Sequence, residues 1–353
     1  MSSKEVRFIN RIKEINALRD YCSNQRYTPI YIYGPEGCGK TRLLKEFTKE
    51  FDKSFGRDAI AIYIDAMENR DVKKALLSSS EINKIVNIFK VGLEASSELV
   101  NMGVPIGQAL SRSISLIIDK IAEKLPEKSL KGKYILIAID DIVRAIGLNK
   151  IEWYVKWLFE LMNKLKEEYE PRAINFIATT SEGMSRRLVA RHRHAHIKLL
   201  WNLDKKAFEE LFYELNPSNV KFEDIWLLFG GNPGKLIELA YDFKWNIDIM
   251  LKTYEVKVRE VVKRIVKEGL TKELELFTED IATAEKILDK KMSALENILE
   301  EANLILYKHW ILLTNETFNK PQPDINIGID YAWQVPMYRS LVMRTLKELK
   351  PTT

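Results

Sequence analysis

The stretch YIYGPEGCGKTR, from Tyr31 to Arg42, constrains this chain more than any other. Residues 34–41 match the pattern G-x-x-x-x-G-K-[ST] at every fixed position, after the apolar run Ile30–Tyr33 and before a helical pattern. Glycines permit tight bends that turn successive backbone N–H groups inward, and the start of a helix adds the positive end of its dipole. The pattern therefore predicts a loop that cradles phosphates between a strand and a helix.

The side chains at the end of this loop predict a nucleotide with its metal ion. Lys40 is expected to bridge β- and γ-phosphate oxygens, and the Thr41 hydroxyl to ligate Mg²⁺. The residues expected to surround the phosphates are Gly34, Pro35, Glu36, Gly37, Cys38, Gly39, Lys40, Thr41 and Arg42.

Composition favours a globular protein of the cytoplasm. The 353 residues are enough for two or three domains, and 46% are hydrophobic and 30% charged. The absence of an uncharged apolar window of membrane-spanning length predicts no membrane association, and the opening residues lack an apolar signal core, which predicts no export. The only two cysteines, Cys22 and Cys38, fit a reducing compartment.

A second informative stretch, from Lys133 to Asp141, is an apolar run that ends in two carboxylates. In a phosphate-loop sheet the carboxyl ends of the strands face the nucleotide. Asp140 is expected to hold Mg²⁺, directly or through water, and Asp141 to orient or deprotonate an attacking water. The alternative is a pair of acids that caps the following helix.

A further buried strand, Ala173–Ser181, ends in hydroxyl side chains where a γ-phosphate would need a sensor. Thr180 is the first choice for that hydroxyl, and Thr179 is the second. The next segment, 185–206, holds seven basic residues and one acid. A guanidinium near a γ-phosphate accelerates its transfer greatly, so we consider Arg193 and Arg187 as candidates. Three alternating histidines in the segment lack cysteine or paired carboxylate partners, which favours a solvated basic rim over a metal site: His192, His194 and His196.

The last third of the chain changes in character after Trp245. Charged helical patterns are followed by two strand-like runs, Leu304–Leu313 and Asp330–Val335, and by a last helix, Met337–Leu349. Helices followed by a hairpin and a final helix are typical of a winged helix. From Tyr241 onward there are 17 basic and 18 acidic residues, a net charge of −1. The basic character of the chain therefore belongs to its nucleotide-binding part.

Taken together, these stretches resemble the archaeal ATPase family of the AAA+-like signal-transduction ATPases, the STAND group. The resemblance covers nearly the whole chain and is carried by these segments in order: Phe8–Arg11 with Glu14, the loop 34–41, Asp140-Asp141, Thr179–Ser181, Gly230–Pro233 and the winged-helix tail.

The resemblance implies an α/β fold of the P-loop NTPase class, AAA+-like, with a parallel sheet flanked by helices. It divides the chain into an ATP-binding core (1–200), a helical lid (201–249) and a winged-helix domain (250–353). It also implies that Phe8 and Arg11 lie by the adenine, that Pro233 closes over the base, and that Arg193 fills the slot of the arginine after the sensor strand.

Two departures from the family pattern bear on function. The acidic strand carries Asp140-Asp141 where many relatives carry Asp-Glu, and the shorter second side chain predicts slow hydrolysis. His192 stands before Arg193 where a small or turn residue is common. The first departure suits a regulator better than a motor.

These features favour a Mg²⁺-dependent ATP/ADP switch with slow ATPase activity and an unidentified protein partner. One alternative is a DNA-binding, initiator-like ATPase, and another is an interaction scaffold that holds nucleotide without hydrolysis. DNA is the less favoured partner, because the helix expected to read a groove, Met292–Ala302, has three glutamates and no basic residue. The wing around Lys320 or the basic segment 185–206 would then have to supply the contacts.

Overall fold

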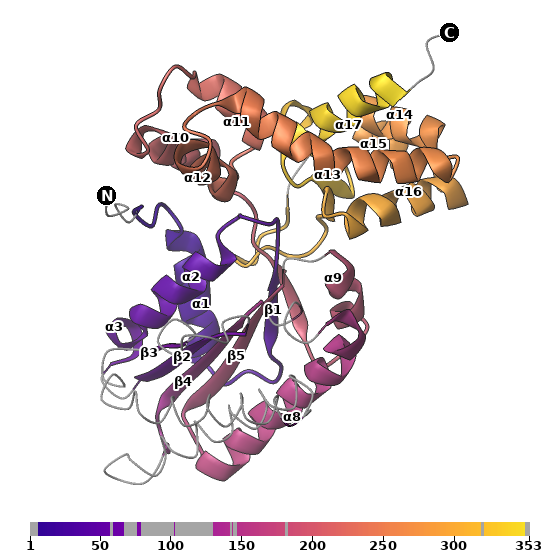
Figure 1. Ribbon diagram of the computed structural model, residues 1–353. Helices are drawn as coiled ribbons and strands as arrows, with labels where there is room; N and C mark the ends of the chain where they lie inside the picture. The colour runs from indigo at the N-terminus through magenta and orange to yellow at the C-terminus, as the bar shows by residue number, and fades with distance from the viewer. Residues whose placement is uncertain are drawn as a thin grey trace.

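The computed structural model describes residues 6–56, 59–66, 76–78, 102, 130–141, 143, 147–180, 183–318 and 321–349. Figure 1 shows two bodies: a sheet with helices on both faces, and above it a helical body formed by the last part of the chain. The carboxyl ends of the central strands point toward the helical body.

The sheet has the strand order β3-β2-β4-β5-β1-β6. Its strands are β1 (Ile30–Tyr33), β2 (Ala59–Asp65), β3 (Leu76–Ser78), β4 (Tyr134–Asp140), β5 (Ala173–Thr180) and β6 (His196–Leu199). All pairings are parallel except that of β2 with β3. Because β5 lies between β1 and β4, the phosphate loop, the two threonines and the two aspartates follow neighbouring strand ends. The predicted α/β class is confirmed.

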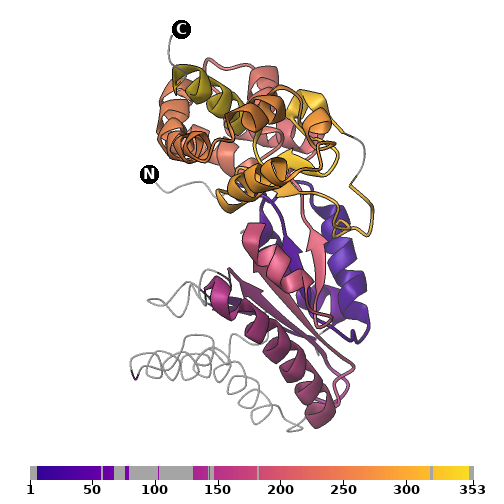
Figure 2. The ribbon, with the colours of Figure 1, turned by 90° about the vertical axis from the view of Figure 1, so that its right-hand side faces the viewer.

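Alternate residues of each strand face different helical layers, which explains the nearly continuous apolar runs. Tyr31 and Tyr33 pack on the side of α8 (Ile151–Tyr169), whereas Ile30 and Ile32 pack on the opposite side. The helices on that second side are α1 (Ile12–Ser23), α2 (Lys40–Lys49) and α3 (Phe51–Phe55). Figure 2 views this layering from the side, with α8 and α9 (Gly183–Ala190) on one face and α1 and α2 on the other.

The helical body begins with the segment predicted to be the lid. It contains α10 (Lys205–Glu214), α11 (Phe222–Phe229) and α12 (Pro233–Tyr241). Asn232 caps α12 by accepting a hydrogen bond from the Lys235 N–H at 3.0 Å, and Pro233 takes the first helical position, where its missing N–H costs nothing.

The remaining elements follow the predicted winged-helix order. They are α13 (Ile247–Lys267), α14 (Thr271–Glu279), α15 (Ile281–Ala284), α16 (Lys290–Glu301), β7 (Ile305–Tyr307), β8 (Tyr331–Trp333) and α17 (Pro336–Leu349), with a short 3₁₀ turn at Pro323–Ile325; a second such turn, Leu148–Lys150, precedes α8 in the core. Strands β7 and β8 pair antiparallel. One hydrophobic core runs through the lid and this unit, from Phe212 and Phe229 to Met250, Leu295 and Leu341. Lys320 lies outside the described residues. Within the described ranges, no helix has both the length and the apolar character of a membrane span.

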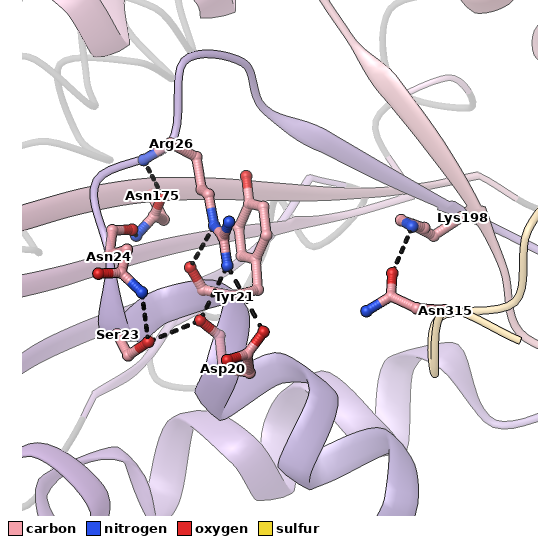
Figure 3. A network of polar contacts seen from close by, with 8 residues as sticks. All are labelled: Asp20, Tyr21, Ser23, Asn24, Arg26, Asn175, Lys198 and Asn315. Carbon is pink, nitrogen blue, oxygen red and sulfur yellow. Dashed lines mark hydrogen bonds and ion pairs between the residues drawn. The ribbon is translucent and has the colours of Figure 1, made fainter.

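The expected strand Leu304–Leu313 is shorter than predicted, because its two halves pair with different partners. Its first half is β7, whereas residues 311–313 lie along the edge of the core sheet. The Leu199 N–H donates to the Ile311 carbonyl at 2.9 Å, and the Leu313 N–H donates to the Leu199 carbonyl at 2.8 Å. Beside them Lys198 donates to the side chain of Asn315 at 2.7 Å (Figure 3). The C-terminal unit, from α13 to α17, therefore extends the sheet of the core at β6.

Candidate nucleotide-binding site

The loop 34–41 joins β1 to α2 in a conformation that depends on glycine. Gly37 and Gly39 have φ angles of 81° and 102°, in the left-handed region that other residues rarely adopt. Gly34 is required for a different reason, since a Cβ atom there would lie 2.0 Å from the Leu200 carbonyl oxygen. The three glycines of the sequence pattern thus permit two bends and one close approach to the chain after β6.

Lys40 is folded back onto the loop. Its ammonium group is buried and donates to the carbonyl oxygens of Gly34 and Pro35, both at 2.9 Å. These bonds hold the lysine against the loop and satisfy two of the three N–H donors of its ammonium group. A phosphate that enters the loop would offer charged acceptors in place of two neutral carbonyls, which strengthens such bonds.

A cavity of about 470 Å³ opens beside the loop. Its walls include most of the residues predicted for nucleotide binding: Phe8, Arg11, Glu36, Gly37, Cys38, Gly39, Lys40, Thr41, Arg42, Asp141 and Pro233. Leu203, Leu211 and Ile237 add apolar surface from the lid side. The lining thus combines residues of the phosphate loop with apolar side chains, a mixture that suits an adenine nucleotide.

Arg11 contacts the cavity, but its charge is directed to the protein itself. The buried guanidinium donates to the Cys38 carbonyl at 2.8 Å, to the Trp201 carbonyl at 2.7 Å and to Glu14 at 2.6 Å. It therefore ties the phosphate loop to the segment that leads into the lid. Nearby, the Arg42 side chain donates to the Val6 carbonyl at 3.1 Å and so holds the N-terminal segment that carries Phe8.

The acidic pair divides into a buried and an accessible residue. Asp140 is buried and accepts hydrogen bonds from the Tyr63 hydroxyl, at 2.8 Å, and from the Thr179 hydroxyl. Burial and the neighbouring Asp140 raise the pKa of Tyr63, so its hydroxyl stays protonated and donates to the carboxylate. Asp141 has a φ of 50° and lines the cavity. Val143, two residues after the pair, is helical, and its neighbours at 142 and 144–146 lie outside the described residues, so the capping alternative stays open.

The two threonines of β5 have different surroundings. Thr179, the second choice for the sensor, bridges the acidic pair: its hydroxyl donates to Asp140 and accepts from the Asp141 N–H at 3.0 Å. Thr180, the first choice, is buried and lies opposite Tyr33 in the register of β5 with β1. Thr180 does not line the cavity. Nothing in the sequence distinguishes adjacent threonines at a strand end, whereas the structure assigns the contact with the acids to Thr179.

The structure does not bring Arg193 to the cavity. It is exposed in the turn before β6, and the parallel register of β6 with β1 places that turn at the amino edge of the sheet, opposite the phosphate loop. The physical reason is that α9 carries the chain back from the carboxyl end of β5. Arg187, the other candidate, pairs with Glu300 on α16 at 2.5 Å, and Arg186 pairs with the same carboxylate at 2.7 Å.

The basic segment 185–206 is therefore not one solvated rim. Arg186 and Arg187 form an interface with the C-terminal unit, Lys198 donates to Asn315, and Lys205 pairs with Glu223 at 2.8 Å. Among the described residues, no group of three or more metal-ligating side chains of the histidine, cysteine or carboxylate type occurs.

Sequence reasoning missed three amide side chains that surround the phosphate loop. Asn232 donates to the Glu36 carbonyl at 2.9 Å and to the Asn202 side chain at 3.0 Å. Gln334 accepts from the Glu36 N–H at 3.1 Å. Asn232 could have been noticed as a helix cap before Pro233, but Gln334 is 298 positions away from Glu36 and has no local pattern.

The chain is similar to proteins named as ATP-binding. An uncharacterised ATP-binding protein of Methanocaldococcus jannaschii is 25% identical over 173 residues, which cover 45% of this chain and 48% of that protein; the chain thus spans about half the length of this relative. A second such protein of the same organism is 24% identical over 359 residues, 91% of this chain and 96% of the relative. Among solved structures, the Aeropyrum pernix ORC2 protein in its ADPNP–ADP complexes is 12% identical, with a TM-score of 0.44 over 98% of this chain and 97% of that one.

A family model described as an ATPase domain predominantly from Archaea matches residues 8–239, which include the phosphate loop, the acidic strand and most of the segment predicted to be the lid. The chain belongs to this family of ATPase domains found predominantly in Archaea.

Proposed function

We propose that this protein binds ATP and ADP in the cavity beside the phosphate loop and acts as a slow, Mg²⁺-dependent ATPase switch. The observation that carries the proposal is the direct contact between lid and loop. The Gly234 N–H donates to the Gly37 carbonyl at 3.0 Å, and a Cβ atom on Gly234 would lie 2.7 Å from the Gly37 Cα atom. A change in the loop on phosphate binding is therefore transmitted to α12 without an intermediate side chain.

Different residues of the cavity would contact the phosphates, the base and the metal ion of the nucleotide. Lys40 and the loop N–H groups would hold the phosphates, and Phe8 and Pro233 would contact the base from two sides of the cavity. The Thr41 hydroxyl and Asp140 would hold Mg²⁺, and this set of oxygen donors fits the preference of that ion. The metal would neutralise charge on the phosphates. Asp141, which reaches the cavity, would orient or deprotonate the attacking water.

The DNA-binding alternative is less favoured because of the position of α16. This helix was expected to enter a groove, but its Asn297 and Glu300 contact Arg187 on the core. Glu300 is fully buried, and Glu301 pairs with Arg264. A helix that is acidic and covered in this way cannot approach phosphates without undocking. This supports an intramolecular or protein-facing role for the C-terminal unit.

Steady-state turnover of Mg·ATP tests the proposal, with Lys40→Ala and Lys49→Ala as a matched pair on the same helix. Lys40→Ala should abolish turnover and weaken ATP affinity, because the phosphates lose their lysine, whereas the exposed Lys49 should be dispensable. Added duplex DNA should leave the rate unchanged. Unchanged ATP affinity in Lys40→Ala would refute the site, and strong stimulation by DNA would favour the initiator-like alternative.

The switch itself requires a second measurement. Hydrogen exchange of the full chain should differ between the ATP-bound and ADP-bound forms in α12 and in the C-terminal unit. Identical exchange in both forms, combined with normal turnover, would mean an ATPase without the proposed conformational response.

A further inference from the structure

We infer that Gln334 of the winged-helix unit is a positioning residue for the phosphate loop, and that nucleotide binding and docking of this unit are thermodynamically coupled through it. The inference rests on the proposed nucleotide site and adds the means by which the C-terminal unit senses it. Gln334 follows β8 directly and is 1% exposed. Its side chain accepts from the Glu36 N–H at 3.1 Å and donates to the Ile305 carbonyl at 3.3 Å.

The backbone of Glu36 is held on both sides by side chains from outside the core sheet. Its N–H is bound by Gln334 of the winged-helix unit, and its carbonyl is bound by Asn232 of the lid. The next residue, Gly37, has the positive φ that begins the bend of the loop. The position of Glu36 therefore sets the direction of the N–H groups that follow.

Asn202 joins these two contacts into one network. Its side chain accepts from Asn232 at 3.0 Å and donates to the Gln334 carbonyl at 3.1 Å. Asn202 and Asn232 are both buried. The three amide side chains of Asn202, Asn232 and Gln334, which we call the amide relay, thus connect the phosphate loop of the core, at Glu36, with the lid and the winged-helix unit. In a buried network, each lost partner leaves an unsatisfied polar group, so the relay favours a single arrangement of the three units.

Coupling through the relay has a definite sign. With Gln334 in place, the loop is already bent as phosphate binding requires, so docking of the winged-helix unit should increase nucleotide affinity. By linkage, bound nucleotide must then favour the docked unit by the same factor. A partner that binds the undocked unit would lower nucleotide affinity by the same factor. Such a partner could therefore promote nucleotide exchange.

Calorimetric titration of ADP and ATP into the full-length Gln334→Leu variant tests this inference. Leucine has similar bulk but cannot accept from the Glu36 N–H, and loss of such a buried bond should weaken both nucleotides about tenfold. Leu341→Ala is the control. It removes a buried side chain from the core of the same unit without touching the loop, so it should weaken nucleotides less than about twofold even though it destabilises the unit.

A second readout separates positioning from mere stability. Bound ADP should slow hydrogen exchange of backbone amides in residues 304–335 of the wild-type and Leu341→Ala chains, but much less in Gln334→Leu. Wild-type affinity in Gln334→Leu, or equal losses in Gln334→Leu and Leu341→Ala, would overturn the inference. Failure of the switch is distinguishable: identical exchange in ATP and ADP would refute the proposed function, while the affinity comparison would still decide the role of Gln334.

Discussion

The contact of Arg186 and Arg187 with Glu300 allows a sharp test of how the two bodies are held together. The Glu300 side chain is 0% exposed and that of Arg186 is 9% exposed, so this is a buried ion pair between α9 of the core and α16. The Arg186 guanidinium also lies 4.7 Å from the centre of the Tyr307 ring. We consider Glu300→Leu, which removes the charge but fills most of the space.

The expected loss is large because the two arginines remain. Removing one partner of a buried pair leaves an uncompensated charge and typically costs about 3–5 kcal/mol. Glu301, the next residue on α16, provides the control: its side chain is 39% exposed and pairs with Arg264, so Glu301→Leu should cost less than about 1 kcal/mol. Replacing all three charged residues, with Met at 186 and 187 and Leu at 300, should recover most of the loss.

Hydrogen exchange of backbone amides in α9 and α16 is the appropriate assay, because it reports opening of this interface rather than unfolding of the whole chain. Glu300→Leu should lower the opening free energy by the amount above. Equal protection in Glu300→Leu and in the wild-type chain would refute the reasoning, since the pair would then contribute nothing to docking. A triple variant no better than Glu300→Leu would show that lost packing, and not the unpaired charge, is the cause.

Three further predictions concern single positions. Asp141→Asn should leave Mg·ATP bound but reduce turnover about 10²–10⁴-fold, because the amide keeps the shape but cannot act as a base; a wild-type rate would move that role to another residue. Pro233→Ala should weaken ATP and ADP equally, by roughly two- to fivefold, because both carry the same base, and titration showing a loss for ATP alone would point to the γ-phosphate instead. Burial, together with Glu285, Asp330 and Glu300 against the opposing Arg187, raises the pKa of Glu296 to about 7. Since the folded state then binds the proton more tightly than the unfolded state, the free energy of unfolding falls as pH rises from 4.5 to 7. In urea denaturation, Glu296→Gln should therefore raise the free energy of unfolding by roughly 1–2 kcal/mol at pH 8 and by only a few tenths of a kcal/mol at pH 5. Equal effects at both pH values would contradict this.

Local patterns predicted the elements that depend on local physics. The phosphate loop and the strand before Asp140 each combine a short spacing with a required conformation, and the structure contains both. The order of helices and strands in the winged-helix unit can also be predicted, because a single sequence shows helical and alternating periodicities directly.

Contacts between distant segments could not be predicted in this way. The sequence places Arg193 after the sensor strand, but the direction of α9 determines which edge of the sheet Arg193 reaches. Arg187 and Glu300 are 113 positions apart in a chain where charged residues are 30% of the total, so no spacing marks them as partners. The same applies to Gln334, whose role depends on where the last hairpin docks.

The segment 311–313 along β6 has a consequence for the order in which the chain is made. Strand β6 leaves the ribosome well before its neighbour, which follows roughly 110 residues later. At about 5–20 residues per second, the edge of the nascent sheet stays uncovered for on the order of ten seconds. An open sheet edge is a template for pairing with other chains. The newly made core is therefore most exposed to aggregation, and to chaperone capture, before the C-terminal unit has been synthesised.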